Sequence, residues 1–228
     1  DKYDVIEENV VAGENVEDNS TLKVPIKTVQ TFKGTDRPIA VMIDNHKAAL
    51  PQGGLNDAYM VYEIIVEGGE SRLMALFKGK DLDKIGPVRS SRHYFLDYAL
   101  ENDAIYVHYG WSPQAKSDIS RYSINNINGI TCSESDFRRI KTKKAPHNVM
   151  TSTSSILSIA KKKGYRTTSS ETSVLNYVTD EVTLEEGIDA TSITIPHSTL
   201  QKVKYEYDEE TQRYTRYARG TLQKDYST

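Results

Sequence analysis

Residues able to do chemistry are most concentrated between positions 85 and 97, where a Gly-Pro pair leads into two serines flanked by arginines. The arginines carry fixed positive charge, and either serine is placed to cap a following helix by accepting a hydrogen bond from its free amides. A helix N-terminus presents unpaired N–H groups and about half a positive charge. These groups together predict an anion-binding site, formed by Arg89, Ser90, Ser91, Arg92 and His93.

A purely structural role for Arg89 and Arg92, paired with carboxylates of their own domain, is the alternative. The sequence does not decide between the two roles, and it identifies no reaction. His93 and Asp97 share a helix face at a spacing of four residues. Pairs at this spacing are common and no nucleophile elbow accompanies them, so we do not expect a Ser-His-Asp relay.

Other polar residues lie where predicted strands end or turn, and we expect them to line a ligand cleft. The apolar run 39–43 predicts a buried strand, and ligands of open α/β sheets collect at the carboxyl ends of such strands. Glu63, Glu67 and Arg72 lie on a predicted hairpin. His108 and Trp111 lie at the turn after a later strand. The candidates for the cleft are Asp44, Asn45, His46, Glu63, Glu67, Arg72, His108 and Trp111.

Structural alternatives exist for these residues too. Glu63, Glu67 and Arg72 are placed to form a cross-strand ion pair, or to offer carboxylates to a substrate or metal. Trp111 is placed to pack in the interior, or to give a flat ligand a stacking surface. The five histidines show no spacing typical of a metal site, so we expect no metal and no cofactor.

The elements that would position these residues alternate between strand and helix, which predicts an α/β fold with a mixed sheet, a β-hairpin and flanking helices. Alternating apolar residues predict the hairpin, closed by Gly68-Gly69. Ser112 and Pro113 are typical of a helix start, and Gly164 of a helix end. Strands are predicted at 39–43, 59–67, 72–77, 104–109 and 127–132, helices at 91–101, 113–122 and 151–163, and a short basic helix around 138–140.

Composition divides the chain into three parts. Residues 1–20 contain seven acidic residues and one lysine, so we expect an acidic flexible tether over 1–31, with only weak strand pairing. An α/β head domain follows at 32–168. Short strand-like segments then predict a smaller β-rich unit at 169–228, with 203–207 pairing with 214–218. No closing strand is evident, so we expect either an incomplete unit or strands that return to the head.

The net charge of −3 at pH 7 conceals an uneven distribution. Residues 137–170 contain nine basic residues and no acidic one, which indicates either a solvated face or a surface for anionic envelope polymers or lipid headgroups. Nucleic acid is not the expected partner, because aromatic residues do not interleave with these charges. Cys132 is the one cysteine, so no intrachain disulfide can form, and we expect it in a buried strand.

Four ordered blocks of the sequence resemble the YerB-like lipoproteins, a domain-of-unknown-function family of Gram-positive bacteria. The blocks are residues 37–45, 62–69, 72–77 and 85–92. The resemblance implies an extracytoplasmic protein, held on the cell membrane by an N-terminal lipid-modified cysteine that this chain lacks. The acidic segment at 1–31 would then suit a tether. The resemblance implies no activity and therefore no catalytic residues.

Two functions are compatible with these observations. The favoured one is a binding module at the cell envelope, for an anionic ligand or a protein partner, because no strong catalytic motif is present. The alternative is an envelope enzyme acting on a phosphate-bearing glycan or lipid, with Asp44, Arg72 and the two arginines of the anion site around the phosphate. One cleft lined by all of the candidate polar residues would favour the enzyme, and their separation into ion pairs would argue against it; those residues are Asp44, His46, Glu63, Arg89, Arg92 and His108.

Overall fold

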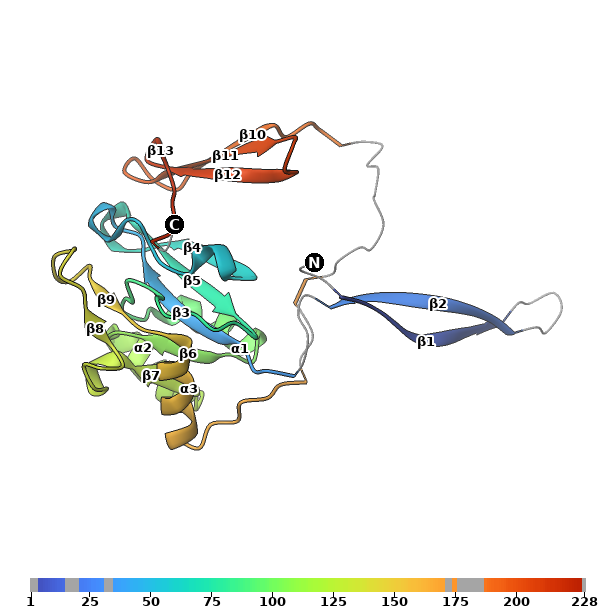
Figure 1. The fold of residues 1–228 in the computed structure, drawn as a ribbon, viewed down its shortest axis with the longest axis horizontal. Helices are drawn as coiled ribbons and strands as arrows, with labels where there is room; N and C mark the ends of the chain where they lie inside the picture. The colour runs from blue at the N-terminus through green and yellow to red at the C-terminus, as the bar shows by residue number, and fades with distance from the viewer. Residues whose placement is uncertain (1–3, 15–20, 31–34, 171–173, 176–186, 227–228) are drawn as a thin grey trace.

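The computed structural model describes residues 4–14, 21–30, 35–170, 174–175 and 187–226. Its head is a five-stranded mixed sheet covered by helices on both faces (Figure 1). The sheet has the order β4-β5-β3-β6-β7, in which β3, β6 and β7 run parallel and the β4–β5 hairpin is antiparallel. The strands are β3 (Ile39–Asp44), β4 (Met60–Ile65), β5 (Ser71–Phe77), β6 (Ile105–His108) and β7 (Asn126–Asn128).

The central strand β3 is buried along its whole length because helices cover both faces of the sheet. On one face, Ile156 and Ile159 of α3 (Thr153–Lys162) pack in the same cluster as Val41. On the other face, α1 (Leu96–Glu101) and α2 (Pro113–Arg121) contribute to a second cluster. A strand buried on both sides has a continuous apolar sequence, which is why residues 39–43 predicted it correctly.

One predicted helix start and one predicted helix end are confirmed, and another predicted helix start is wrong. The Ser112 side chain accepts from the Ala115 amide ahead of α2, and Gly164 has a positive φ just after α3. The predicted helix at 91–101 instead begins with a 3₁₀ turn at His93–Phe95, and α1 covers only Leu96–Glu101. Neither serine caps it, because the residue preceding the 3₁₀ turn is Arg92 and no side chain accepts there.

Two predictions after β6 are also wrong. The strand predicted at 127–132 stops at Asn128, whose side chain accepts from the Ile130 amide and starts a 3₁₀ turn at Gly129–Thr131, so Cys132 is only half-buried and outside any strand. The basic helix predicted near 138–140 is a strand, β8 (Arg138–Arg139), which pairs with β9 (Val149–Met150). Pairing with a segment eleven residues away is invisible to local sequence patterns.

Shorter 3₁₀ turns at Lys47–Ala49, Leu55–Asp57 and Glu67–Gly69 connect the first strands. The last of these closes the β4–β5 hairpin, and both Gly68 and Gly69 have positive φ angles of 72° and 74°. Glycine adopts this conformation without a Cβ clash, so the predicted reversal at these two residues is confirmed.

A four-stranded antiparallel sheet forms the C-terminal unit, with the order β10-β11-β12-β13. Val203 pairs with Ala218 and Tyr207 with Tyr214, as the sequence predicts. A strand-like segment that the sequence shows at 174–178 lies partly outside the described residues, and only 174 and 175 of it are described. The fold is therefore an α/β head followed by a smaller β-rich unit. Its strands are β10 (Ser192–Pro196), β11 (Lys202–Asp208), β12 (Arg213–Ala218) and β13 (Thr221–Leu222).

The N-terminal segment contains more regular structure than the sequence indicated. β1 (Asp4–Glu14) pairs with β2 (Thr21–Gln30) as an antiparallel hairpin that projects away from the head (Figure 1). The register pairs Val11 with Val24, so β-branched residues that suggested only weak pairing lie opposite each other. The division into tether, head and second unit remains a prediction.

Replacement of a core side chain gives a test of the head's packing. Phe77 is 1% exposed, and we expect Phe77→Ala to lower the free energy of unfolding by about 3–5 kcal/mol through lost burial and a residual cavity. Leu100→Ala, at a position 45% exposed, should change it by less than about 0.5 kcal/mol. Urea denaturation measures both. Equal effects would show that Phe77 is not part of a packed core.

Candidate functional site

Three arginines, here called the arginine cluster, gather at the carboxyl end of β3: Arg72, Arg89 and Arg92. Arg72 is only 8% exposed, pairs in register with Asp44 across β3 and β5, and donates through Nη1 to the Ser90 carbonyl at 2.6 Å. Burial, together with the charges of Arg92 and Arg89, lowers its pKa to about 10. A buried guanidinium beside two like charges favours an anion nearby.

The loop that carries Arg89 is fixed against the end of β3 by backbone hydrogen bonds. The Asp44 amide donates to the Pro87 carbonyl at 2.8 Å, and the Arg89 amide donates to the Met42 carbonyl at 2.8 Å. Gly86 permits this path, because a Cβ there would lie 2.8 Å from the Val149 carbonyl oxygen and its φ is 137°. The Gly-Pro pair in the sequence therefore serves to bring Arg89 to the strand end.

Asp44 is the carboxylate around which this end of the sheet is arranged. Its Oδ1 accepts from the His46 amide at 3.0 Å. Its Oδ2 lies 3.2 Å from Arg89 Nε and 2.8 Å from His147 Nδ1. Asp44 is also almost fully buried. The contact with Arg89 is an ion pair without hydrogen-bond alignment, and Arg89 Nε is a buried donor with no acceptor among the residues that the structure describes.

Arg92 is held by Glu67, through two hydrogen bonds of 2.6 and 2.9 Å from its guanidinium to the two carboxylate oxygens. Glu67 is 66% exposed in its side chain, so this pair stands at the rim of the cluster. The cluster then holds three positive charges against two negative ones. The excess positive charge and the unsatisfied Arg89 donor favour an anionic ligand, while the two ion pairs match the structural alternative, so the anion site remains a prediction.

His147 adds an ionisable group that is not among the predicted site residues. A carboxylate accepts the Nδ1 proton, so in the neutral ring the lone pair lies on Nε2. The His46 ring stacks on that of His147, with centroids 4.3 Å apart and planes at 15°. The one indication in the sequence was that His147 lies shortly before the apolar pair Val149-Met150. It was too weak to identify His147, because β9 was not predicted.

The carboxylates of the hairpin do not pair with Arg72, which corrects the predicted cross-strand ion pair. Glu63 lies opposite Leu73, so it points to the other side of the sheet from Arg72. Its Oε1 accepts from Asn45 at 3.1 Å and its Oε2 from Arg216 of the C-terminal sheet at 2.5 Å. Glu63 and Asn45 therefore join the head to the second unit rather than to the arginine cluster.

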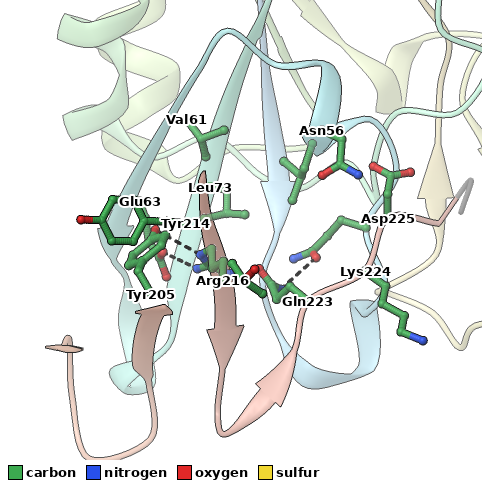
Figure 2. Close-up of a pocket in the computed structure, with 13 residues that line it drawn as sticks. Asn56, Val61, Glu63, Leu73, Tyr205, Tyr214, Arg216, Gln223, Lys224 and Asp225 are labelled. Atoms are coloured by element: carbon green, nitrogen blue, oxygen red, sulfur yellow. Dashed lines mark hydrogen bonds and ion pairs between the residues drawn. The ribbon is translucent and has the colours of Figure 1, made fainter. Parts of the chain in front are cut away.

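Figure 2 shows this junction as a pocket between β4–β5 and the C-terminal strands, with Arg216 directed toward Glu63. The pocket has a volume of about 390 Å³ and includes Tyr205 and Tyr214 in its wall. A second contact lies beside it, where Arg219 forms an ion pair with Glu70 and donates to the Asn45 carbonyl.

The other predicted site residues fill structural positions or lie outside the cluster. His108 is fully buried with its pKa lowered by burial, and it contacts the Trp111 ring at 5.3 Å. Ser91 accepts from the Tyr106 hydroxyl at 2.9 Å, and Ser90 donates to the Tyr109 carbonyl at 3.1 Å. His93 is exposed at the start of the turn before α1. Trp111 is partly buried and packs on the ring of His108, which is nearer to the structural alternative for that residue.

In the part of the chain that the structure describes, no group of three or more His, Cys, Asp or Glu side chains is arranged to hold a metal ion. Across the same residues, no helix has the length and apolar character that a membrane crossing requires.

Comparison with known proteins identifies relatives. Residues 26–166 match the family model described as the N-terminal domain of a protein of unknown function, DUF3048. The chain is 34% identical over 209 residues to the "Putative lipoprotein YerB" of Bacillus subtilis (strain 168), covering 91% of this chain and 63% of that protein. The crystal structure of YerB from Bacillus subtilis superposes with a TM-score of 0.77 at 33% identity, covering 87% of this chain and 68% of that one. The chain thus spans less than two thirds of the length of the curated relative.

The Arg92–Glu67 contact can be tested by titration. The pKa of Glu67 lies below its ordinary value of 4.5, chiefly because Arg92 donates hydrogen bonds to it. The contact therefore stabilises the fold fully above pH 4.5, and this stabilisation is lost as the pH falls through the lower folded pKa. We expect Arg92→Gln to return the Glu67 pKa toward 4.5, measured from its carboxyl carbon by NMR. Arg213→Gln on β12 should leave it unchanged, and an unaltered pKa in Arg92→Gln would refute the contact.

Proposed function

We propose that this chain binds an anionic, phosphate-type ligand at the outer face of the cell membrane. The chain belongs to the DUF3048 family of proteins of unknown function, so the proposal is argued from its own site. The observation that carries the proposal is the burial of Arg72 between two other arginines. Charge-assisted hydrogen bonds from guanidinium to phosphate are strong and often bidentate. The three arginines of the cluster, which are only partly neutralised, therefore suit a phosphate ligand.

The location at the membrane rests on likeness. The relative from Bacillus subtilis is named as a lipoprotein, and 34% identity over most of this chain supports the same placement here. A lipid anchor upstream of the head would hold the arginine cluster in the envelope, where phosphate groups of lipids and glycans are abundant. The acidic segment over residues 1–20 would avoid an anionic surface by repulsion and so suits a spacer.

Access to the cluster favours a small anionic group over a broad protein surface as the ligand. Arg72 and Asp44 lie nearly buried, whereas the Arg89 side chain is 26% exposed and therefore reachable. An incoming phosphate could approach the exposed part of the Arg89 guanidinium and accept a charge-assisted hydrogen bond there.

Binding of inorganic phosphate and pyrophosphate, measured by calorimetry, tests the proposal. Removing a charged donor costs about 1.5–3 kcal/mol, so Arg89→Gln should weaken binding by about 10- to 100-fold. The same variant should lose the rise in melting temperature that the ligand gives the unaltered protein.

Arg213→Gln is the matched control, because Arg213 is exposed on β12, away from the cluster. It should bind both anions as the unaltered protein does. Circular dichroism of Arg89→Gln establishes that the variant is folded. Equal affinity of the two variants, or no binding by the unaltered protein, would contradict the proposal.

A second candidate function, an enzyme acting on a phosphate-bearing glycan or lipid, is favoured by the Asp44–His147 pair. With Nδ1 engaged by Asp44, His147 Nε2 is placed to act as a general base. Water would give a proton to Nε2 while its oxygen bonds to phosphorus. The bond from phosphorus to the leaving oxygen would break with its electron pair on that oxygen. Asp44 would stabilise the imidazolium, which then returns its proton to solvent.

Hydrolysis of pyrophosphate and of 4-nitrophenyl phosphate tests this candidate, because neither leaving group requires a proton donor. A general base contributes about 10²–10⁴ in rate, so His147→Gln should lower turnover by that factor with little change in pyrophosphate affinity. His197→Gln, at the junction with the second unit, is the control. Turnover that survives in His147→Gln, or none above background in the unaltered protein, would leave binding as the function.

A further inference from the structure

A second group of positive charges adjoins the arginine cluster and takes no part in the site described above. The loop between β8 and β9 carries a basic segment, residues 138–148, here called the basic hairpin. Figure 1 shows it at the end of the head far from the N-terminal β1–β2 hairpin. Its basic residues are Arg138, Arg139, Lys141, Lys143 and Lys144.

Specific contacts fix the basic hairpin beside the arginine cluster. His147 at its base binds Asp44 at 2.8 Å. Lys143 Nζ donates to the Pro51 carbonyl at 2.7 Å, in the turn that follows β3. Arg139 lies over the Tyr109 ring at 5.3 Å, and the Tyr109 amide donates to the Arg89 carbonyl at 2.9 Å. Positive charge therefore continues from Arg89 onto the basic hairpin.

The charges of the basic hairpin are available to a ligand. Arg138, Arg139, Lys141 and Lys144 are exposed. None of the five basic side chains forms an ion pair with a carboxylate in the described ranges, whereas Arg89 and Arg92 both do. Residues 137–170 contain no acidic residue, and the acids just before this stretch, Glu134 and Asp136, form no ion pair with it in the described ranges. A solvated face usually mixes both signs of charge, so this stretch is organised for attraction of anions.

The arginine cluster is recessed and the basic hairpin beside it is exposed. Together they favour an elongated ligand. Arg72 is 8% exposed, which a flat lipid surface could not reach, but a single phosphate group at the end or along the side of a chain could. The phosphates that follow it in a chain would then lie along the basic hairpin. A ligand with one phosphate would leave the hairpin's charges unused.

From these contacts we propose that the ligand is a linear phosphate polymer, with one phosphate at the arginine cluster and its neighbours along the basic hairpin. The inference rests on the proposed function and names its ligand class. Each lysine or arginine that neutralises a phosphate adds a salt-dependent term to affinity, because bound counterions are released. The polymer should therefore bind far more tightly than pyrophosphate at low salt, and lose that advantage at high salt.

Calorimetry with pyrophosphate and with inorganic polyphosphate of fixed length tests the proposal on the whole chain. The variant Arg138→Gln, Lys141→Gln, Lys144→Gln removes three exposed charges from the hairpin. We expect its pyrophosphate affinity to be unchanged. Its polyphosphate affinity should depend less on salt, because three phosphate contacts are lost. Between about 50 and about 200 mM salt, this affinity should fall on the order of 20-fold less than that of the unaltered protein.

The matched control is Lys161→Gln, Lys162→Gln, Lys163→Gln, which removes the same charge from the exposed C-terminal turn of α3. Figure 1 places that turn at a different end of the head from β8 and β9. The control should bind polyphosphate with the salt dependence of the unaltered protein. An equal effect of the two triple variants would show that only net charge matters, and would overturn the proposal.

Two further outcomes separate the possible failures. If pyrophosphate binds and depends on Arg89, but polyphosphate binds no better at low salt, the polymer proposal fails and the proposed function stands. If neither anion depends on Arg89, both fail. Vesicles of phosphatidylglycerol and phosphatidylcholine form the last arm, and hairpin-dependent binding to vesicles without binding to polyphosphate would assign the basic hairpin to a membrane surface instead.

Discussion

Compensation of buried positive charge by one carboxylate, Asp44, is the constraint on which the site depends. A guanidinium such as that of Arg72 is buried only at the cost of desolvation, and Asp44 lies opposite it in the sheet, in contact with Arg89 and hydrogen-bonded to His147. Asp44 comes at the end of the fully buried strand β3, so its position is set by the core. Three segments far apart in the sequence are held at one point because each brings a group that this carboxylate can bind.

The compensation is incomplete, and this gives the site its character. Asp44 and Glu67 offer two negative charges to three arginines, and the basic hairpin adds lysines and arginines that form no ion pair with a carboxylate in the part of the chain that the structure describes. Structural ion pairs normally balance, since an unpaired buried charge is costly. The excess of positive charge lies at the carboxyl end of the parallel strands, where α/β folds bind ligands. This excess is the physical basis for inferring a bound anion rather than a purely structural network.

A second polar junction begins one residue further along. Asn45 donates to Glu63 and to Ser71, and Glu63 in turn binds Arg216 of the C-terminal sheet. The ion pair of Arg219 with Glu70 reinforces the contact (Figure 2 shows the adjoining pocket). The neighbouring residues Asp44 and Asn45 thus organise the anion site and the attachment of the second unit.

Local pattern in the sequence determined the elements whose signal lies within a few residues: the buried run of β3, the Gly68-Gly69 hairpin, the Ser112 cap of α2 and the pairing of β11 with β12. It also indicated Arg89, Arg92, Asp44 and Arg72 as candidate site residues, because arginines beside a predicted helix start suit an anion and ligands of α/β sheets collect at strand ends. Only the tertiary structure decided their partners. Glu67 binds Arg92 across 25 residues, and Glu63 binds Arg216 of the second unit across 153 residues. His147 binds Asp44 across 103 residues. Periodicity and capping are short-range effects, whereas the choice of ion-pair partner depends on which strands become neighbours, and that is settled by burial of the whole core.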